Sequence, residues 1–174
     1  MNAIVVYESH WGNTAAVAEA IAQGIGAGAR AMSTSEATPA VVAEADLVVA
    51  GSPVMAFNLP SERMRATMTT DHKAPRPPDM SHPSLQAWLE GLAPVHALAA
   101  AFETRLRFSP GGATGAIERS LERVGYRTVA KAGKFIVTGA YGPLREGEAE
   151  RARQWGADLW VAMREEAPRA LTLV

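Results

Sequence analysis

Six consecutive residues near the start of the chain, Ser9-His10-Trp11-Gly12-Asn13-Thr14, combine small size with hydrogen-bonding groups. The hydroxyl and amide groups of Ser9, Asn13 and Thr14 can donate hydrogen bonds to an anion. Gly12 lets the backbone approach that anion closely because it lacks a Cβ. The segment contains no Lys or Arg. It therefore predicts a site that holds a phosphate monoester through neutral dipoles, rather than a nucleoside triphosphate with its metal ion.

The segments on either side of this turn have the patterns of a buried strand and an amphipathic helix. Residues Ala3 to Tyr7 (AIVVY) form an apolar, β-branched run, which is typical of a strand buried on both faces of a parallel sheet. Further on, Val17, Ile21 and Ile25 recur every four residues and predict a helix with one face on the sheet. Unpaired N–H groups and partial positive charge at the helix start favour an anion in the turn.

Strand, turn and helix together resemble the flavodoxin signature over its whole length, with Val5-Val6-Tyr7-x-Ser9-x-x-Gly12-Asn13-Thr14-x-x-x-Ala18-x-x-Ile21 as the matching pattern. In flavodoxins this turn holds the ribityl phosphate of FMN. The resemblance therefore implies FMN as cofactor, bound by Ser9, His10, Trp11, Gly12, Asn13 and Thr14. The alternative is that these residues only form a turn and cap the helix. The Walker pattern needs a Lys and the dinucleotide fingerprint needs three spaced glycines, and this turn has neither.

The order of elements after the first helix predicts an α/β fold. Ala29 to Ser33 reads as a second strand, Thr38 to Ala43 as a short helix, and Asp46 to Gly51 as a third, buried strand. A βαβαβ series implies a parallel sheet with both faces covered. The resemblance implies a flavodoxin-like three-layer αβα sandwich whose five-stranded parallel sheet has the order 2-1-3-4-5. Ligands of such sheets bind beyond the carboxyl ends of the strands, where the turns should converge.

The turn after the third strand is apolar where a loop would normally be polar. Gly51-Ser52-Pro53 matches the flavodoxin loop that lies against the flavin ring, so the resemblance places this turn at the ring. The residues expected there are Pro53, Val54, Met55, Ala56 and Phe57. Met55 and Phe57 stand in for the aromatic residue that the family often stacks on the ring. The alternative is that both are core residues or part of an interface patch.

The fourth strand is predicted over Val95 to Phe102, with His96 at the end of the sheet away from the ligand. In flavodoxins the loop after this strand covers the second face of the flavin. The residues expected at the cofactor from this loop are Phe102, Glu103, Thr104 and Arg105. A cation such as Arg105 beside the flavin would favour its reduced anion and raise its potential. The alternative for Arg105 and Arg107 is a solvated charged edge.

The remaining segments predict helices and a divided last strand. Helices are expected over Ser61 to Thr69, Ser84 to Leu92, Thr114 to Val124 and about Arg145 to Met163, and strand pieces over Tyr126 to Ala130 and Lys134 to Thr138. The proline-rich segment 70–83 reads as an irregular loop. It holds two His and two Asp residues without the close spacing of metal ligands, so no metal site is predicted. One FMN-binding domain, residues 1–163, is expected, followed by a loose tail, residues 164–174.

Composition narrows the possible functions. The 174 residues include 17 basic and 18 acidic side chains, which gives a formal net charge of -1 and no cysteine. Nothing in this balance indicates nucleic acid or an anionic membrane as a partner, and thiol or iron–sulfur chemistry is excluded. The chain begins without the pattern of a signal peptide, so we expect a cytoplasmic protein.

Three functions are compatible with the sequence. The first is electron transfer through noncovalently bound FMN, with no catalytic side chain, to a redox partner protein or a small-molecule electron acceptor. The second is an FMN-dependent oxidoreductase acting on a quinone or a porphyrin-type substrate. The third is a non-redox binding module on the same fold, because a fold alone does not establish a function. Of these functions, electron transfer is favoured over an enzymatic activity.

Overall fold

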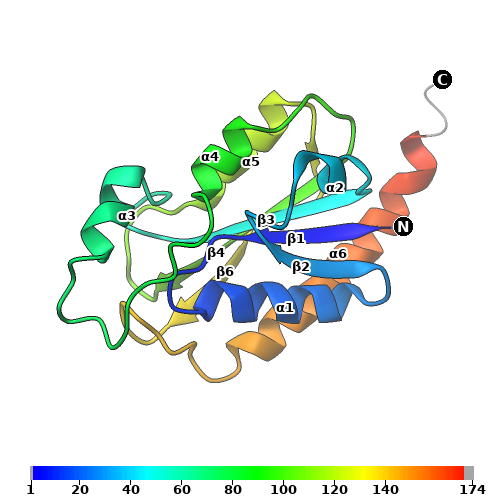
Figure 1. The fold of residues 1–174 in the computed structure, drawn as a ribbon. Helices are drawn as coiled ribbons and strands as arrows, with labels where there is room; N and C mark the ends of the chain where they lie inside the picture. The colour runs from blue at the N-terminus through cyan, green and yellow to red at the C-terminus, as the bar shows by residue number, and fades with distance from the viewer. Residues whose placement is uncertain (1, 171–174) are drawn as a thin grey trace.

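The computed structural model describes residues 2–170, with side chains up to residue 166, and its centre is a parallel β-sheet (Figure 1). Its strands are β1 (Ala3–Tyr7), β2 (Ala29–Ser33), β3 (Leu47–Pro53), β4 (Leu98–Leu106), β5 (Arg127–Thr128) and β6 (Gly133–Val137). Their order is β2-β1-β3-β4-β5, and β6 also pairs with β4, further along the same strand. The predicted strand order and the predicted division of the last strand into two pieces are both confirmed.

Helices cover both faces of the sheet, as Figure 1 shows. The helices are α1 (Asn13–Ile25), α2 (Pro39–Ala43), α3 (Glu62–Met68), α4 (Leu85–Glu90), α5 (Thr114–Arg123) and α6 (Glu148–Ala170). Alternation along β1 sends Val5 into the core under α1 and α6, and sends Ile4 and Val6 into the core under α2, α4 and α5. The predicted three-layer α/β sandwich is therefore confirmed. None of the described helices combines the length and the apolar character needed to cross a membrane.

The first and last helices, α1 and α6, pack against each other through glycine. A Cβ added to Gly24 would lie 1.9 Å from the carbonyl oxygen of Arg153, and one added to Gly156 would lie 2.2 Å from that of Ile21. Both distances are far below van der Waals contact, so only glycine allows the two backbones to approach this closely. This contact fixes α1, and with it the turn that precedes α1.

Two predicted boundaries are wrong. Strand β4 begins at Leu98 rather than Val95, because the N–H of Val95 bonds to the carbonyl of Val124 outside the sheet, and β4 runs on to Leu106. Helix α6 continues through Pro168 to Ala170, whereas the sequence predicted a loose tail from residue 164. A proline costs the hydrogen bond of its own nitrogen, and in the last turn few further bonds depend on it. The rest of that predicted tail, residues 171–174, lies outside the described residues.

Candidate functional site

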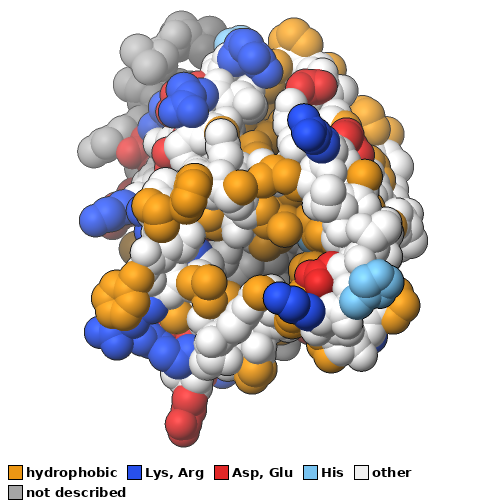
Figure 2. Space-filling view, turned by 90° about the vertical axis from the view of Figure 1, so that its left-hand side faces the viewer, with side chains coloured by type: hydrophobic (Ala, Val, Ile, Leu, Met, Phe, Trp, Pro, Cys, Tyr) orange, Lys and Arg blue, Asp and Glu red, His pale blue; other side chains and the backbone are white. Residues whose placement is uncertain are grey.

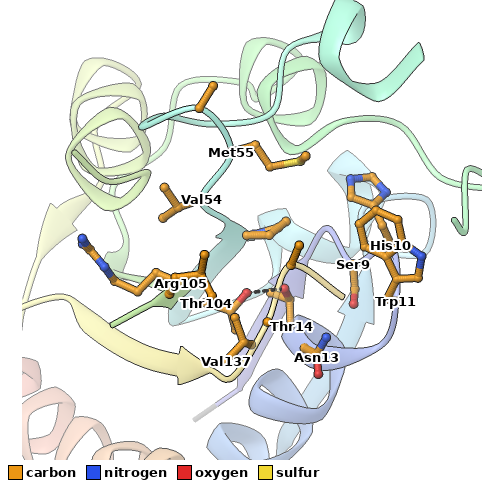
Figure 3. Close-up of a pocket in the computed structure, with 15 residues that line it drawn as sticks. Ser9, His10, Trp11, Asn13, Thr14, Val54, Met55, Thr104, Arg105 and Val137 are labelled. Carbon is orange, nitrogen blue, oxygen red and sulfur yellow. Dashed lines mark hydrogen bonds between the residues drawn. The ribbon is translucent and has the colours of Figure 1, made fainter. Parts of the chain in front are cut away.

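A cavity of about 210 Å³ lies where the carboxyl ends of β1, β3, β4 and β6 meet (Figure 3). The turn after β1 forms one wall, the turn after β3 a second, and the ends of β4 and β6 the remainder. The lining residues are Ser9, His10, Trp11, Asn13, Thr14, Pro53, Val54, Met55, Ala56, Thr104, Arg105, Leu106, Val137, Gly139 and Ala140. Four segments that are far apart in sequence therefore converge on one site, as expected for a parallel sheet.

The turn before α1 has donors that the protein itself does not use. Ser9 is 5% exposed, and its Oγ has no hydrogen-bond partner among the described residues. Gly12 has a φ of 91° and is the N-cap of α1, and no side chain caps this helix. The hydroxyl and amide groups of the turn therefore do not cap α1, which was the alternative interpretation of these residues. The amide of Asn13 instead donates to the carbonyl of Tyr141 (3.1 Å), so the unused side-chain donor is that of Ser9. A buried hydroxyl without a partner is costly, and an anion bound at the helix start would satisfy it.

Thr14 and Thr104 join two walls of the cavity. Their Oγ1 atoms lie 2.8 Å apart and are hydrogen-bonded, as the dashed line in Figure 3 shows, and both residues are buried. A hydroxyl can donate one hydrogen bond while it accepts another. Thr14 can therefore accept from Thr104 and keep its own proton for a ligand in the turn.

The opposite side of the cavity is apolar and includes a tight turn. Figure 3 shows Val54 and Met55 facing Ser9, His10 and Trp11 across the cavity. Met55 and Asn58 form an antiparallel bridge, and between them Ala56 and Phe57 have φ values of 40° and 75°. Positive φ at both central residues of a two-residue turn is usually supplied by Asn or Gly. The N–H of Gly112 donates to the carbonyl of Phe57 (2.9 Å) and holds the turn in place.

A group of buried charges lies directly beneath the turn before α1. Glu8 is fully buried, forms an ion pair with Arg65 of α3, and accepts a hydrogen bond from the N–H of Leu85 (2.8 Å). His10 Nε2 lies 3.1 Å from Glu8 Oε1. Burial alone would raise the pKa of the Glu8 carboxyl, but the contacts with His10, the Leu85 N–H and Arg65 outweigh burial and lower that pKa below its ordinary value. No sequence pattern predicts this group, because its members come from segments that are far apart in the chain.

The proline-rich loop, residues 70–83, covers the outside of the same turn. Arg76 Nη2 donates to the carbonyl of Trp11 (2.8 Å), and the indole N–H of Trp11 donates to the carbonyl of Arg76 (3.3 Å). The N–H of Asp79 donates to the carbonyl of His10 (2.8 Å), and His82 Nε2 lies 3.0 Å from the carbonyl oxygen of Ser9. Sequence-distant residues therefore hold the turn in shape. No group of three or more potential metal ligands occurs in the described part of the chain.

Arg76 changes the expected electrostatics of the turn. A Cβ added to Gly12 would lie 3.5 Å from Arg76 Nη2, so the guanidinium group lies against the glycine of the turn. No carboxylate pairs with Arg76 among residues 2–166. The turn itself has no Lys or Arg, but a positive charge reaches it from the loop. An anion bound there would therefore be attracted by the charge of Arg76 as well as by neutral dipoles.

The comparisons with known proteins concern structure. Neither a protein-family model nor a curated protein sequence matches the chain. Its structure superposes on a flavodoxin from the domain Archaea with a TM-score of 0.65 at 22% identity, covering 94% of this chain and 99% of that one. The chain has the flavodoxin fold.

Other proteins that share the flavodoxin fold differ in size. A WrbA-like flavodoxin from Agrobacterium tumefaciens superposes with a TM-score of 0.62 at 21% identity, over 94% of this chain and 98% of that chain. Rubredoxin oxygen:oxidoreductase from Desulfovibrio gigas gives a TM-score of 0.64 at 16% identity, over 95% of this chain but only 36% of that chain. The fold therefore occurs alone and as part of larger proteins, and at these identities the likeness establishes the fold only.

Most residues predicted at the cofactor line the cavity of the flavodoxin fold, but four lie elsewhere. Gly12 shapes the turn from behind, and Phe57 is 60% exposed outside the cavity. Phe102 lies in the middle of β4, fully buried against Phe135 with ring centroids 6.4 Å apart. Glu103 is fully buried, and its Oε2 accepts from the N–H groups of Ala113 (2.7 Å) and Thr114 (3.0 Å) at the start of α5.

The position of Glu103 also changes what Arg105 can do. Arg105 lines the cavity, but its Nη1 donates to Glu103 Oε1 (2.7 Å) and to the carbonyl of Gly111 (3.1 Å). Its charge is therefore largely balanced by a buried carboxylate, and the expected effect of a free cation is reduced. Four residues that line the cavity were not predicted from the sequence: Leu106, Val137, Gly139 and Ala140. The extension of β4 and the second piece of the divided last strand place them there.

Proposed function

We propose that the protein binds FMN noncovalently and transfers electrons through it. The observation that supports this most directly is the buried Ser9 Oγ without a partner, at the start of a helix that no side chain caps. The hydroxyls of Ser9 and Thr14 and the first N–H groups of α1 would hold the phosphate. Val54, Met55 and Trp11 would supply apolar contacts to the ring. When bound, the flavin supplies one- and two-electron chemistry, which requires no nucleophile or general acid from the protein.

The size of the cavity agrees with a partly exposed ligand. Its volume of about 210 Å³ is below the roughly 300–1,000 Å³ of sites that enclose a drug-sized molecule. The protein would therefore bury the phosphate end and part of the ring, and leave the rest at the open mouth of the cavity. An exposed edge is what an electron-transfer site needs, because the partner must come close to the ring.

A titration of the apoprotein with FMN, riboflavin and FAD tests the proposal. We expect a yellow protein that prefers FMN, and we expect Ser9→Ala to weaken FMN binding about 10- to 100-fold, because a hydrogen bond to a charged group contributes about 1.5–3 kcal/mol. Riboflavin lacks the phosphate, so its affinity should not change in the variant. Ser35→Ala, at an exposed position, is the matched control. A colourless protein that ignores all three flavins would favour the non-redox binding module instead.

The position of Arg76 predicts a salt-dependent preference for the phosphate. Arg76→Gln should weaken FMN binding roughly fivefold at low ionic strength, which corresponds to about 1 kcal/mol, and should leave riboflavin binding unchanged. The difference should shrink with added salt because an exposed charge is screened. Fluorescence titration at two salt concentrations measures this. Arg76→Lys should keep most of the affinity, and an equal loss for both flavins would mean that Arg76 acts only on the shape of the turn.

A second candidate function is an FMN oxidoreductase that acts on a small acceptor such as a quinone. The observation that favours it is an open groove directly beside the cavity, which shares Leu106 and Val137 with it. Steady-state oxidation of NADH or NADPH with a quinone separates the two functions, since a carrier should turn over little without a separate reductase.

A further inference from the structure

The groove beside the cofactor cavity is formed by the ends of two neighbouring strands. It is open to solvent and has a volume of about 570 Å³. Two residues, Leu106 and Val137, line both the groove and the cavity. The end of β4 and the turn after it form one side, and the end of β6 with Arg145 forms the other. Its lining residues are Leu106, Arg107, Phe108, Ser109, Ile136, Val137, Thr138 and Arg145.

The groove has an excess of positive charge. Arg107 has no ion pair among the described residues, and its guanidinium carbon lies 5.3 Å from the ring centroid of Phe108. Arg145 Nη2 bonds to Glu148 Oε1 (2.5 Å), but the same buried carboxylate also pairs with Arg151. One carboxylate between two guanidinium groups leaves a net positive charge there. No Asp or Glu lines the groove, although the whole chain has a formal net charge of -1.

The groove also exposes apolar side chains. Phe108 is 87% exposed and Leu106 is 44% exposed. Exposed hydrophobic residues that gather beside a cavity commonly mark a binding site, whereas scattered ones need no explanation. Figure 2 shows hydrophobic side chains in the hollow of this face of the molecule and Lys or Arg side chains along its edge. An aromatic ring with a negative group would satisfy both features, since the ring can pack on Phe108 and Leu106 while Arg107 pairs with the charge.

We propose that this groove binds a planar apolar anion, such as an aromatic carboxylate or sulfonate. Binding of the anion depends only on residues of the groove. Its role as a small-molecule electron acceptor rests on the proposed function, because only a protein that binds FMN in the neighbouring cavity would place the anion beside a flavin. Such a groove would then select acceptors by their negative charge.

Isothermal titration calorimetry with two matched probes tests the groove. Naphthalene-2-sulfonate is the anionic probe and naphthalene-2-sulfonamide its neutral counterpart, each titrated into the apoprotein and into FMN-loaded protein. We expect the sulfonate to bind about tenfold more tightly. Arg107→Gln should remove most of that difference without changing sulfonamide binding, whereas Phe108→Ala should weaken both probes about equally. Arg30→Gln removes the same charge from an exposed position on β2, at the far edge of the sheet, and should change neither.

Three results would overturn the proposal: no binding of the sulfonate at millimolar concentration, equal affinity for both probes, or equal losses in Arg107→Gln and Arg30→Gln. Because the apoprotein titration needs no flavin, failure of the groove and failure of the proposed function are distinguishable. If the protein binds the sulfonate but not FMN, the groove is a binding site for anions, and its role as an electron-acceptor site is wrong.

Discussion

Replacing Thr14 with isoleucine is expected to weaken FMN binding about 1,000-fold. Thr14 is 2% exposed, and its hydroxyl can accept the hydrogen bond from Thr104 while it donates toward the turn. The loss of a hydrogen bond to a charged group costs about 1.5–3 kcal/mol, and the extra bulk of isoleucine, which would crowd the bound phosphate, costs about 1–3 kcal/mol more, as in an overpacked core. Together they give about 4 kcal/mol, or three powers of ten in affinity. Absorbance titration of the apoprotein with FMN measures the change.

Two further variants separate the phosphate contact from the packing of the cavity. Thr104→Val removes the hydrogen bond between Thr104 and Thr14 but leaves the Thr14 hydroxyl in place. It should therefore weaken FMN binding no more than about tenfold. Thr14→Ser restores the hydroxyl without the methyl group and should recover most of the affinity. If Thr14→Ile folds and binds FMN as the original protein does, the phosphate lies elsewhere and the assigned turn is wrong.

Replacing Glu8 with alanine should give the largest loss of stability, about 3–5 kcal/mol in the free energy of unfolding. The substitution leaves the guanidinium of Arg65, which is 4% exposed, with only the exposed Glu62 (3.6 Å) as a carboxylate partner among the described residues, and a buried charge that has lost its close partner is costly. Urea unfolding measures the effect. Glu150→Ala is the control, because Glu150 pairs with Arg153 at the surface, and exposed ion pairs contribute about 0–1 kcal/mol. Removing both charges in Glu8→Ala/Arg65→Met should recover part of the loss.

The same carboxylate makes stability depend on pH. The folded-state pKa of Glu8 is lowered from its ordinary value of 4.5. Its stabilising contribution is therefore fully present above that ordinary value and is lost as the pH falls through the lower, folded-state value. Glu8→Gln cannot be deprotonated, so the difference in unfolding free energy between it and the original protein should be largest near neutral pH and should narrow in acid. A constant difference at all pH values would mean that Glu8 does not titrate on unfolding.

The sequence predicted the sheet and the turn before α1 because both depend on local patterns. The run Ala3 to Tyr7 and the spacing of Val17, Ile21 and Ile25 lie within one short segment, and the structure confirms strand, turn and helix there. Strand boundaries that depend on hydrogen bonds to sequence-distant residues were harder to predict. Strand β4 starts three residues later than predicted because Val95 bonds to Val124, a residue that is distant in sequence. The strand also runs on to Leu106, past its predicted end at Phe102, and this extension places Phe102 in the core instead of at the edge of the sheet.

The parts of the site that the sequence did not reveal are those built by long-range contacts. Arg76 lies in a loop without regular structure, and long-range bonds, including its own to Trp11, place it at the turn. Glu8, Arg65 and His82 come from three separate segments and meet only after folding. Phe57 was expected at the ring because of its type, but the positive φ values of its turn direct it outward. The residue types therefore identified the turn before α1, but most of the contacts that support this turn could not be predicted from them.

The close contact of α1 and α6 has a consequence for how the protein is made. The turn before α1 is synthesised well before α6, the helix that covers α1. Gly24 and Gly156 can meet only after α6 has left the ribosome. Domains of this kind acquire their packing as units during synthesis. A nascent chain that has not yet released α6 therefore carries the anion-binding residues without the helix that fixes them, and it becomes competent for its ligand only after α6 has packed on α1.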